Sequence, residues 1–102
     1  MLSPKQRQYL KAQAHHLKPL VHVGKGGVSQ SLAAELDVML ESLELMKIKL
    51  NQNATDDVDA VIGELEAKVE GLEPVWTIGR TLLVFRASRN KPSRYTLPAT
   101  QG

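Results

Sequence analysis

The chain has 102 residues, a formal net charge of +2 and no cysteine. This length suits a single domain with one modest hydrophobic core. The absence of cysteine excludes disulfides and thiolate chemistry, and no apolar run approaches the ~20 residues that a membrane-spanning helix requires. We therefore expect a small monomeric protein of the cytoplasm, without a membrane partner.

Charge is strongly segregated along the sequence. Residues 1–34 and 74–102 each carry five Lys or Arg and no acid, whereas residues 35–73 carry all eleven acids beside three lysines. We interpret this pattern as one face that attracts a polyanion and another that repels it. The alternative is that the charges only solvate the surface.

The first 29 residues predict a helix, a strand and a glycine-rich loop. Ser3 caps the helix, Pro4 suits its first position, and the helix ends near His16. Residues 20–23 form a short strand. The loop after this strand consists of Gly24, Lys25, Gly26 and Gly27. Ser29 is then a good cap for the next helix.

The middle of the chain predicts a helix, a strand and a third helix. Apolar residues recur at helical spacing over 32–45, and an alternating strand follows over 46–50. Thr55 caps the third helix and Gly71 terminates it. Acidic side chains are expected on the outer faces of both helices, as on a solvated surface; those of the first of the two are Asp37, Glu41 and Glu44.

The last part of the chain predicts a hairpin and a tail. The hairpin strands cover 75–78 and 82–86, and glycine suits the first position of a type II′ turn at Gly79-Arg80. We expect one domain over residues 1–88 and a basic, loosely held tail over 89–102.

The element order α-β-α-β-α-β-β predicts the fold class. Strands separated by helices require crossover connections, and the final hairpin adds an antiparallel strand. We expect an α/β (α+β) two-layer sandwich with a four-stranded mixed sheet.

The glycine loop is the strongest candidate for a binding site. It brings backbone N–H groups, a helix N-terminus and Lys25 around one point, which favours a phosphate. Its spacing fits neither the Walker A loop nor the dinucleotide-binding motif, and a plain strand-to-helix turn is the simpler alternative. The predicted RNA-binding residues are Gly24, Lys25, Gly26 and Gly27 with Lys11, Lys18, Arg80 and Arg86. Trp76 and the other aromatic residues are scattered, so phosphate and shape recognition is expected rather than stacking.

Three segments together resemble the CRM domain (chloroplast RNA splicing and ribosome maturation), in the form of the stand-alone bacterial YhbY-type proteins. The resemblance covers about residues 2–97, and its three segments are 17–27, 43–50 and 78–86. It implies an RNA-binding protein that associates with precursors of the large ribosomal subunit. It also implies a KH-like G-x-x-G loop at Gly24 to Gly27 and a sheet like that of the C-terminal domain of translation initiation factor three, with the last strand antiparallel to the others.

Other classes of function find less support in the sequence. His15, His16 and His22 lack carboxylate or thiolate partners nearby in sequence, so no metal or other cofactor is expected. No nucleophile with a base and no inward-facing pair of carboxylates is evident, so we expect neither an enzyme nor a small-molecule substrate. The alternative function is a protein-interaction adaptor that docks through its acidic helices.

Overall fold

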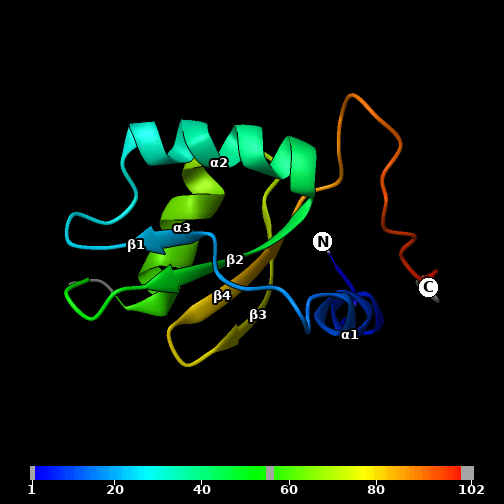
Figure 1. Cartoon of the computed structure of the whole chain (residues 1–102), viewed down its shortest axis with the longest axis horizontal. Coiled ribbons are helices and arrows are strands. Elements are labelled where there is room, and N and C mark those ends of the chain that lie inside the picture. The colour runs from blue at the N-terminus through cyan, green and yellow to red at the C-terminus, as the bar shows by residue number, and fades with distance from the viewer. Residues whose placement is uncertain (1, 55–56, 100–102) are drawn as a thin grey trace.

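The computed structural model describes residues 2–54 and 57–99. It contains three helices and four strands in the predicted order (Figure 1). Their bounds are α1 (Pro4–Gln13), β1 (Val21–Val23), α2 (Gln30–Leu43), β2 (Leu45–Leu50), α3 (Val58–Lys68), β3 (Glu73–Ile78) and β4 (Thr81–Phe85). None of these helices is both long and apolar enough to span a membrane.

The four strands form one mixed sheet in the order β1-β2-β4-β3. β1 and β2 are parallel, whereas β4 is antiparallel to both of its neighbours, β2 and β3. The predicted mixed sheet with an antiparallel last strand is therefore confirmed. The two-residue turn between β3 and β4 begins with Gly79 at a φ of 58°, a conformation that glycine adopts at little cost.

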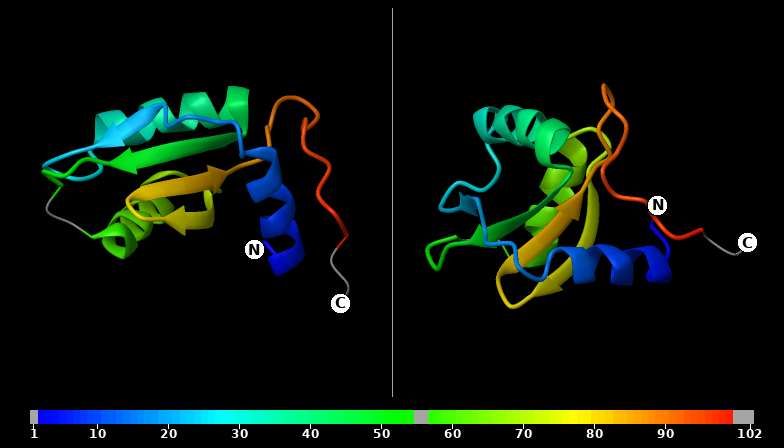
Figure 2. Two further views of the ribbon diagram at one scale, coloured as in Figure 1. Left: turned by 60° about the horizontal axis from the view of Figure 1, so that its bottom comes forward. Right: turned by 45° about the vertical axis from the view of Figure 1, so that its right-hand side comes forward.

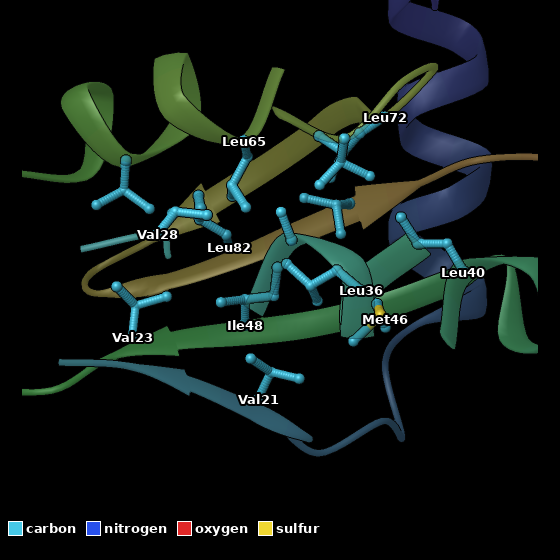
Figure 3. Close-up of a cluster of buried hydrophobic side chains, with 14 of the residues drawn as sticks. Val21, Val23, Val28, Leu36, Leu40, Met46, Ile48, Leu65, Leu72 and Leu82 are labelled. Atoms are coloured by element: carbon cyan, nitrogen blue, oxygen red, sulfur yellow. The ribbon is translucent and has the colours of Figure 1, made fainter. Parts of the chain in front are cut away.

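The main core lies between one face of the sheet and the helices α2 and α3 (Figure 3). Leu36 and Leu40 of α2 and Leu65 of α3 are fully buried against sheet residues such as Ile48 and Leu82. Burial of this apolar surface is the dominant stabilising term of the fold. It confirms the apolar stripes that predicted both helices.

A second cluster covers one end of the opposite face of the sheet, where α1 crosses it (Figure 2). Leu10 of α1 and its C-cap Ala14 pack there with Leu45, Leu83 and Phe85 of the sheet. Because α1 covers only this end, the rest of the face stays open to solvent.

Capping side chains fix where each helix begins. Ser3 and Gln6 form the predicted capping box, and the hydroxyl of Ser29 accepts from the backbone N–H of Leu32 at 3.0 Å. Thr55, the predicted cap of α3, lies outside the described residues; Asp57 caps the helix by accepting from Ala60 N–H at 2.8 Å. The predicted helix ends were too late, since α1 ends at Gln13, α2 at Leu43 and α3 at Lys68, before Gly71.

The chain after β4 is held more firmly than the sequence indicated. The carboxylate of Glu44 accepts from the backbone N–H groups of Ser88 and Arg94, both at 2.8 Å, and Glu41 accepts from Arg89 N–H at 3.0 Å. Tyr95 meets Phe85 edge-on, with ring centroids 6.0 Å apart. Over its described part this segment is docked, in contrast to the loosely held tail that we predicted; the domain boundary at residue 88 stays a prediction.

Two of the acids predicted on a solvated outer face, Glu41 of α2 and Glu44 at its C-cap, therefore do not belong to such a face. Glu44 is only 2 % exposed, and its φ of 66° turns the chain abruptly from α2 into β2. Glu41 is also partly covered by the tail that it binds. Helical periodicity misplaced both residues because it takes no account of a distant segment returning to the helix end.

Candidate nucleic-acid interface

Three loops meet at one end of the sheet, on the left and lower side of Figure 1. The backbone N–H of Asn51 donates to Val23 O at 2.8 Å, which ties the loop after β2 to the end of β1. Arg80, in the hairpin turn, donates from Nη2 to Asn51 O at 2.7 Å. The glycine loop, the Asn51 loop and the hairpin turn thus form one continuous edge, the loop end of the sheet.

The glycine loop is a tight turn in which Gly26 is an open position. The N–H of Gly27 donates to Gly24 O at 3.1 Å, while Gly26 and Gly27 have φ values of 99° and 69°. A Cβ at Gly24 would lie 3.4 Å from the side chain of Asn53, whereas a Cβ at Gly26 would meet nothing within 4 Å. Gly26 therefore offers closer approach to a ligand than Gly24, because the neighbouring asparagine loop lies against Gly24.

The open face of the sheet continues from this loop end. Residues opposed in neighbouring strands share a face, and two rows of side chains result. The outer row, nearest the loop end, is His22, Lys49, Thr81 and Ile78. The inner row, beside α1, is Lys47, Leu83 and Trp76. Neither row contains a carboxylate, so the face has a basic character.

An irregularity in β3 determines which way Trp76 points. Pro74 pairs with Val84, but Trp76 pairs with Leu83, so Val75 is an extra residue in β3. Without this bulge, strand alternation would turn Trp76 toward the core of α2 and α3. Proline is tolerated here because β3 is an edge strand. Trp76 is consequently 46 % exposed on the open face, where the ammonium of Lys11 lies 3.5 Å from its ring centroid.

Comparisons with known proteins agree with this architecture. The family model of the CRS1/YhbY (CRM) domain matches residues 2–86. The chain belongs to this family.

Relatives and a solved structure cover nearly the whole CRM domain. The "Probable RNA-binding protein YqeI" of Bacillus subtilis is 38 % identical, with 87 % of this chain and 92 % of the relative covered. A Haemophilus influenzae protein named "RNA-binding protein" is 34 % identical, with 85 % and 87 % covered. The solution structure of Staphylococcus aureus SAV1595, described as a hypothetical protein and a candidate RNA-binding protein, matches with a TM-score of 0.76 and 34 % identity, covering 96 % of this chain and all of that one.

The structure of this CRM domain separates the predicted basic residues into three groups. Lys25 is exposed in the glycine loop, and Lys11 and Lys18 are exposed on and just after α1. Arg80 lies at the loop end, but its guanidinium donates to the backbone carbonyls of Leu50 and Asn51. Arg86 does not extend the basic surface as predicted, because its side chain is only 5 % exposed and bonds Asp37 at 2.6 Å.

Three carboxyl groups, those of Asp37, Glu41 and Glu44, bind the segment 86–94, and we call this arrangement the tail clamp. The pKa values of all three are shifted. A hydrogen bond from Arg86 lowers the pKa of Asp37. The Ser88 hydroxyl and two backbone N–H groups lower the pKa of Glu41 to about 2. Burial raises the pKa of Glu44, but hydrogen bonds from the tail outweigh it and the net pKa lies below the usual value.

Sequence reasoning missed several parts of this interface. Asn51 and Asn53 gave no signal beyond a loop, although Asn51 Oδ1 lies 3.2 Å from His22 Nδ1 and Asn53 covers Gly24. Trp76 was not assigned to the interface because the aromatic residues are scattered along the sequence. Pro74 was left outside the predicted strand over 75–78, although β3 begins at Glu73 and has its bulge beside this proline. Among the described residues no group of three His, Cys, Asp or Glu is placed to hold a metal ion.

Proposed function

We propose that this CRM domain binds RNA through the loop end and the open face of the sheet. The observation that supports this is the placing of exposed Lys25 at the loop end, of Lys49 and Lys47 in the two rows of the open face, and of exposed Lys11 beside them, with no carboxylate in either row. Phosphate contacts of this kind supply most of the affinity in nucleic-acid binding and make it depend on salt. The relatives are named as RNA-binding proteins, which supports the same function.

The first test removes one charge at the glycine loop. Lys25 is exposed, so Lys25→Ala is expected to leave stability unchanged and to lower the magnitude of the salt slope by roughly 0.7–0.9. Lys25→Glu is expected to weaken binding further by repelling the phosphate. Substitution of Gly26 is a poorer probe, because its φ of 99° strains any L-residue.

The control for this test is Lys91→Ala, which removes the same charge from an exposed position in the tail. Affinity for a ribosomal RNA fragment is measured at several salt concentrations, with thermal melts as the control for folding. If Lys25→Ala and Lys91→Ala bind like the parent, the glycine loop is only a turn.

We further propose that the RNA belongs to a precursor of the large ribosomal subunit, as the family resemblance implies. A tagged chain is expected to co-sediment with that precursor in a gradient of cell extract, and Lys25→Glu is expected to shift it toward free protein. Co-purification with a protein after nuclease treatment would instead favour the adaptor. That alternative has less acidic surface available than the sequence indicated, because Glu41 and Glu44 bind the chain's own tail.

A further inference from the structure

The open face carries an exposed apolar patch beside its cations. Trp76 and Ile78 are neighbours on this face and are 46 % and 69 % exposed. Water contact with two large apolar side chains is unfavourable by about 25 cal/mol per Å² of exposed surface. A contiguous apolar patch with a polar rim is typical of a binding site.

Two hollows flank the tryptophan, and both are lined by Trp76 and Lys11. One, of about 170 Å³, extends toward Lys47 and Ile78. The other, of about 310 Å³, extends toward Arg7. A water molecule takes about 30 Å³ in the liquid, so each hollow admits a much larger group. Neither hollow is lined by a carboxylate.

The cations around the Trp76 ring indicate which kind of ligand fits there. Lys11 lies 3.5 Å from the centroid of the Trp76 ring, and Lys47 and Arg7 lie in the walls on either side. The Lys11 ammonium lies over the face of the indole ring, and the Arg7 guanidinium lies in a neighbouring wall. This arrangement matches a flat base joined to phosphates, where the base takes the place of the ammonium on the ring and the ammonium turns to a phosphate. A duplex keeps its bases stacked inside, so the ring can stack only on an unpaired base.

We propose that Trp76 is a stacking platform for an unpaired base of single-stranded RNA, with Lys11 and Lys47 contacting the adjoining phosphates. The Lys47 ammonium also donates to Leu17 O at 2.8 Å, and this bond fixes its position in the wall. This inference rests on the proposed RNA-binding function and adds a preference for single-stranded segments. The bulge at Val75 has a role in it, because the bulge is what turns Trp76 onto the open face.

The chain provides its own probe, since Trp76 is the only tryptophan. An unstructured oligouridine RNA is titrated into the full chain while Trp fluorescence and the anisotropy of labelled RNA are recorded. A blunt duplex RNA of the same length serves as the comparison. We expect the oligouridine to quench the fluorescence and the duplex to leave it nearly unchanged.

Variants test the energetic contribution of the ring. Trp76→Ala is expected to weaken oligouridine binding roughly 5- to 100-fold, the usual loss for one stacked base, and duplex binding less than twofold. Trp76→Phe keeps an aromatic face and is expected to recover most of the affinity. The control is Val38→Ala, at an apolar residue that is 68 % exposed on α2, which is expected to bind like the parent.

The outcomes separate this inference from the proposed function. If Lys25→Ala weakens RNA binding while Trp76→Ala does not, the loop binds RNA and the stacking proposal is wrong. If the parent binds no RNA, both proposals fail. If Trp76→Ala abolishes self-association or binding of a protein instead, the face is a protein interface and the proposal is overturned. Should Trp76→Ala fail to fold, quenching in the parent and the affinity of Trp76→Phe decide the question.

Discussion

Arg86 offers a direct comparison between a binding role and a structural one. Its guanidinium donates to Asp37 Oδ1 at 2.6 Å, to Asp37 O at 2.8 Å and to Glu70 O at 3.1 Å. Arg86→Met keeps most of the side-chain volume and removes all three hydrogen bonds. We expect this variant to lose stability and to retain its affinity for RNA.

The size of the stability loss follows from these contacts. The Asp37 side chain is 46 % exposed, so water replaces its lost partner. The two backbone acceptors lose about 1.5 kcal/mol each, at the lower end for hydrogen bonds to charged groups. The buried Nε of Arg86 has no partner among the described residues, and its removal offsets about 1 kcal/mol. The net loss is about 2 kcal/mol, or a fall in Tm of about 8–16 °C.

The assay combines thermal melts with RNA affinity measured below the melting range. Arg89→Met is the matched control, because Arg89 binds the same Asp37 at 3.0 Å but is about half exposed. Exposed ion pairs contribute little, so this control is expected to lose under ~1 kcal/mol. The reasoning is refuted if Arg86→Met melts like the parent and lowers the salt slope for RNA, as a surface phosphate contact would.

Two further predictions concern the core and the tail clamp. Leu36 is fully buried, so Leu36→Ala is expected to lower the free energy of unfolding by about 2–5 kcal/mol in denaturant melts. Glu35→Ala, at an exposed neighbouring residue, is expected to change it by less than ~0.5 kcal/mol. Equal losses in the two variants would contradict the placement of α2. The pKa of Glu41 is lowered from 4.5 to about 2, so its contribution to stability is complete above pH 4.5 and disappears as the pH falls toward 2. Thermal melts between pH 5 and pH 2 are expected to show a steeper loss of stability for the parent than for Glu41→Gln, and parallel curves would show that the clamp does not form in solution.

The local elements could be predicted because each depends on nearby residues. Ser3 with Pro4 and Gln6 determines the start of α1, and Gly79 permits the hairpin turn. The apolar spacing over 32–45 predicted a helix with one buried face, and Leu36 lies on that face. These signals lie within one or two turns of chain, where sequence patterns are most informative.

The sequence predictions were wrong at side chains whose binding partners lie far away in the sequence. Arg86 has the composition of a surface cation, but Asp37 and the Glu70 carbonyl surround it in the fold. Glu44 has a helical position by sequence, yet it serves as the acceptor for a segment about 44 to 50 residues further along. No local pattern encodes such pairings, because they depend on tertiary contacts that form only when the sheet is complete.

Ion pairing in the fold explains why the segregated charges act differently at the two ends of the chain. At the C-terminal end, Arg86, Arg89 and Arg94 pair with Asp37, Glu41 and Glu44, so these cations hold the tail against α2. At the N-terminal end, Lys11, Lys18 and Lys25 remain exposed and lie on or near the open face and the loop end. The acids of α3 stay on the opposite helical layer, where they repel a polyanion. Under the proposed function, this distribution of charge directs an RNA strand to the face that carries Trp76, and of the three C-terminal arginines only Arg86 is withdrawn from the surface.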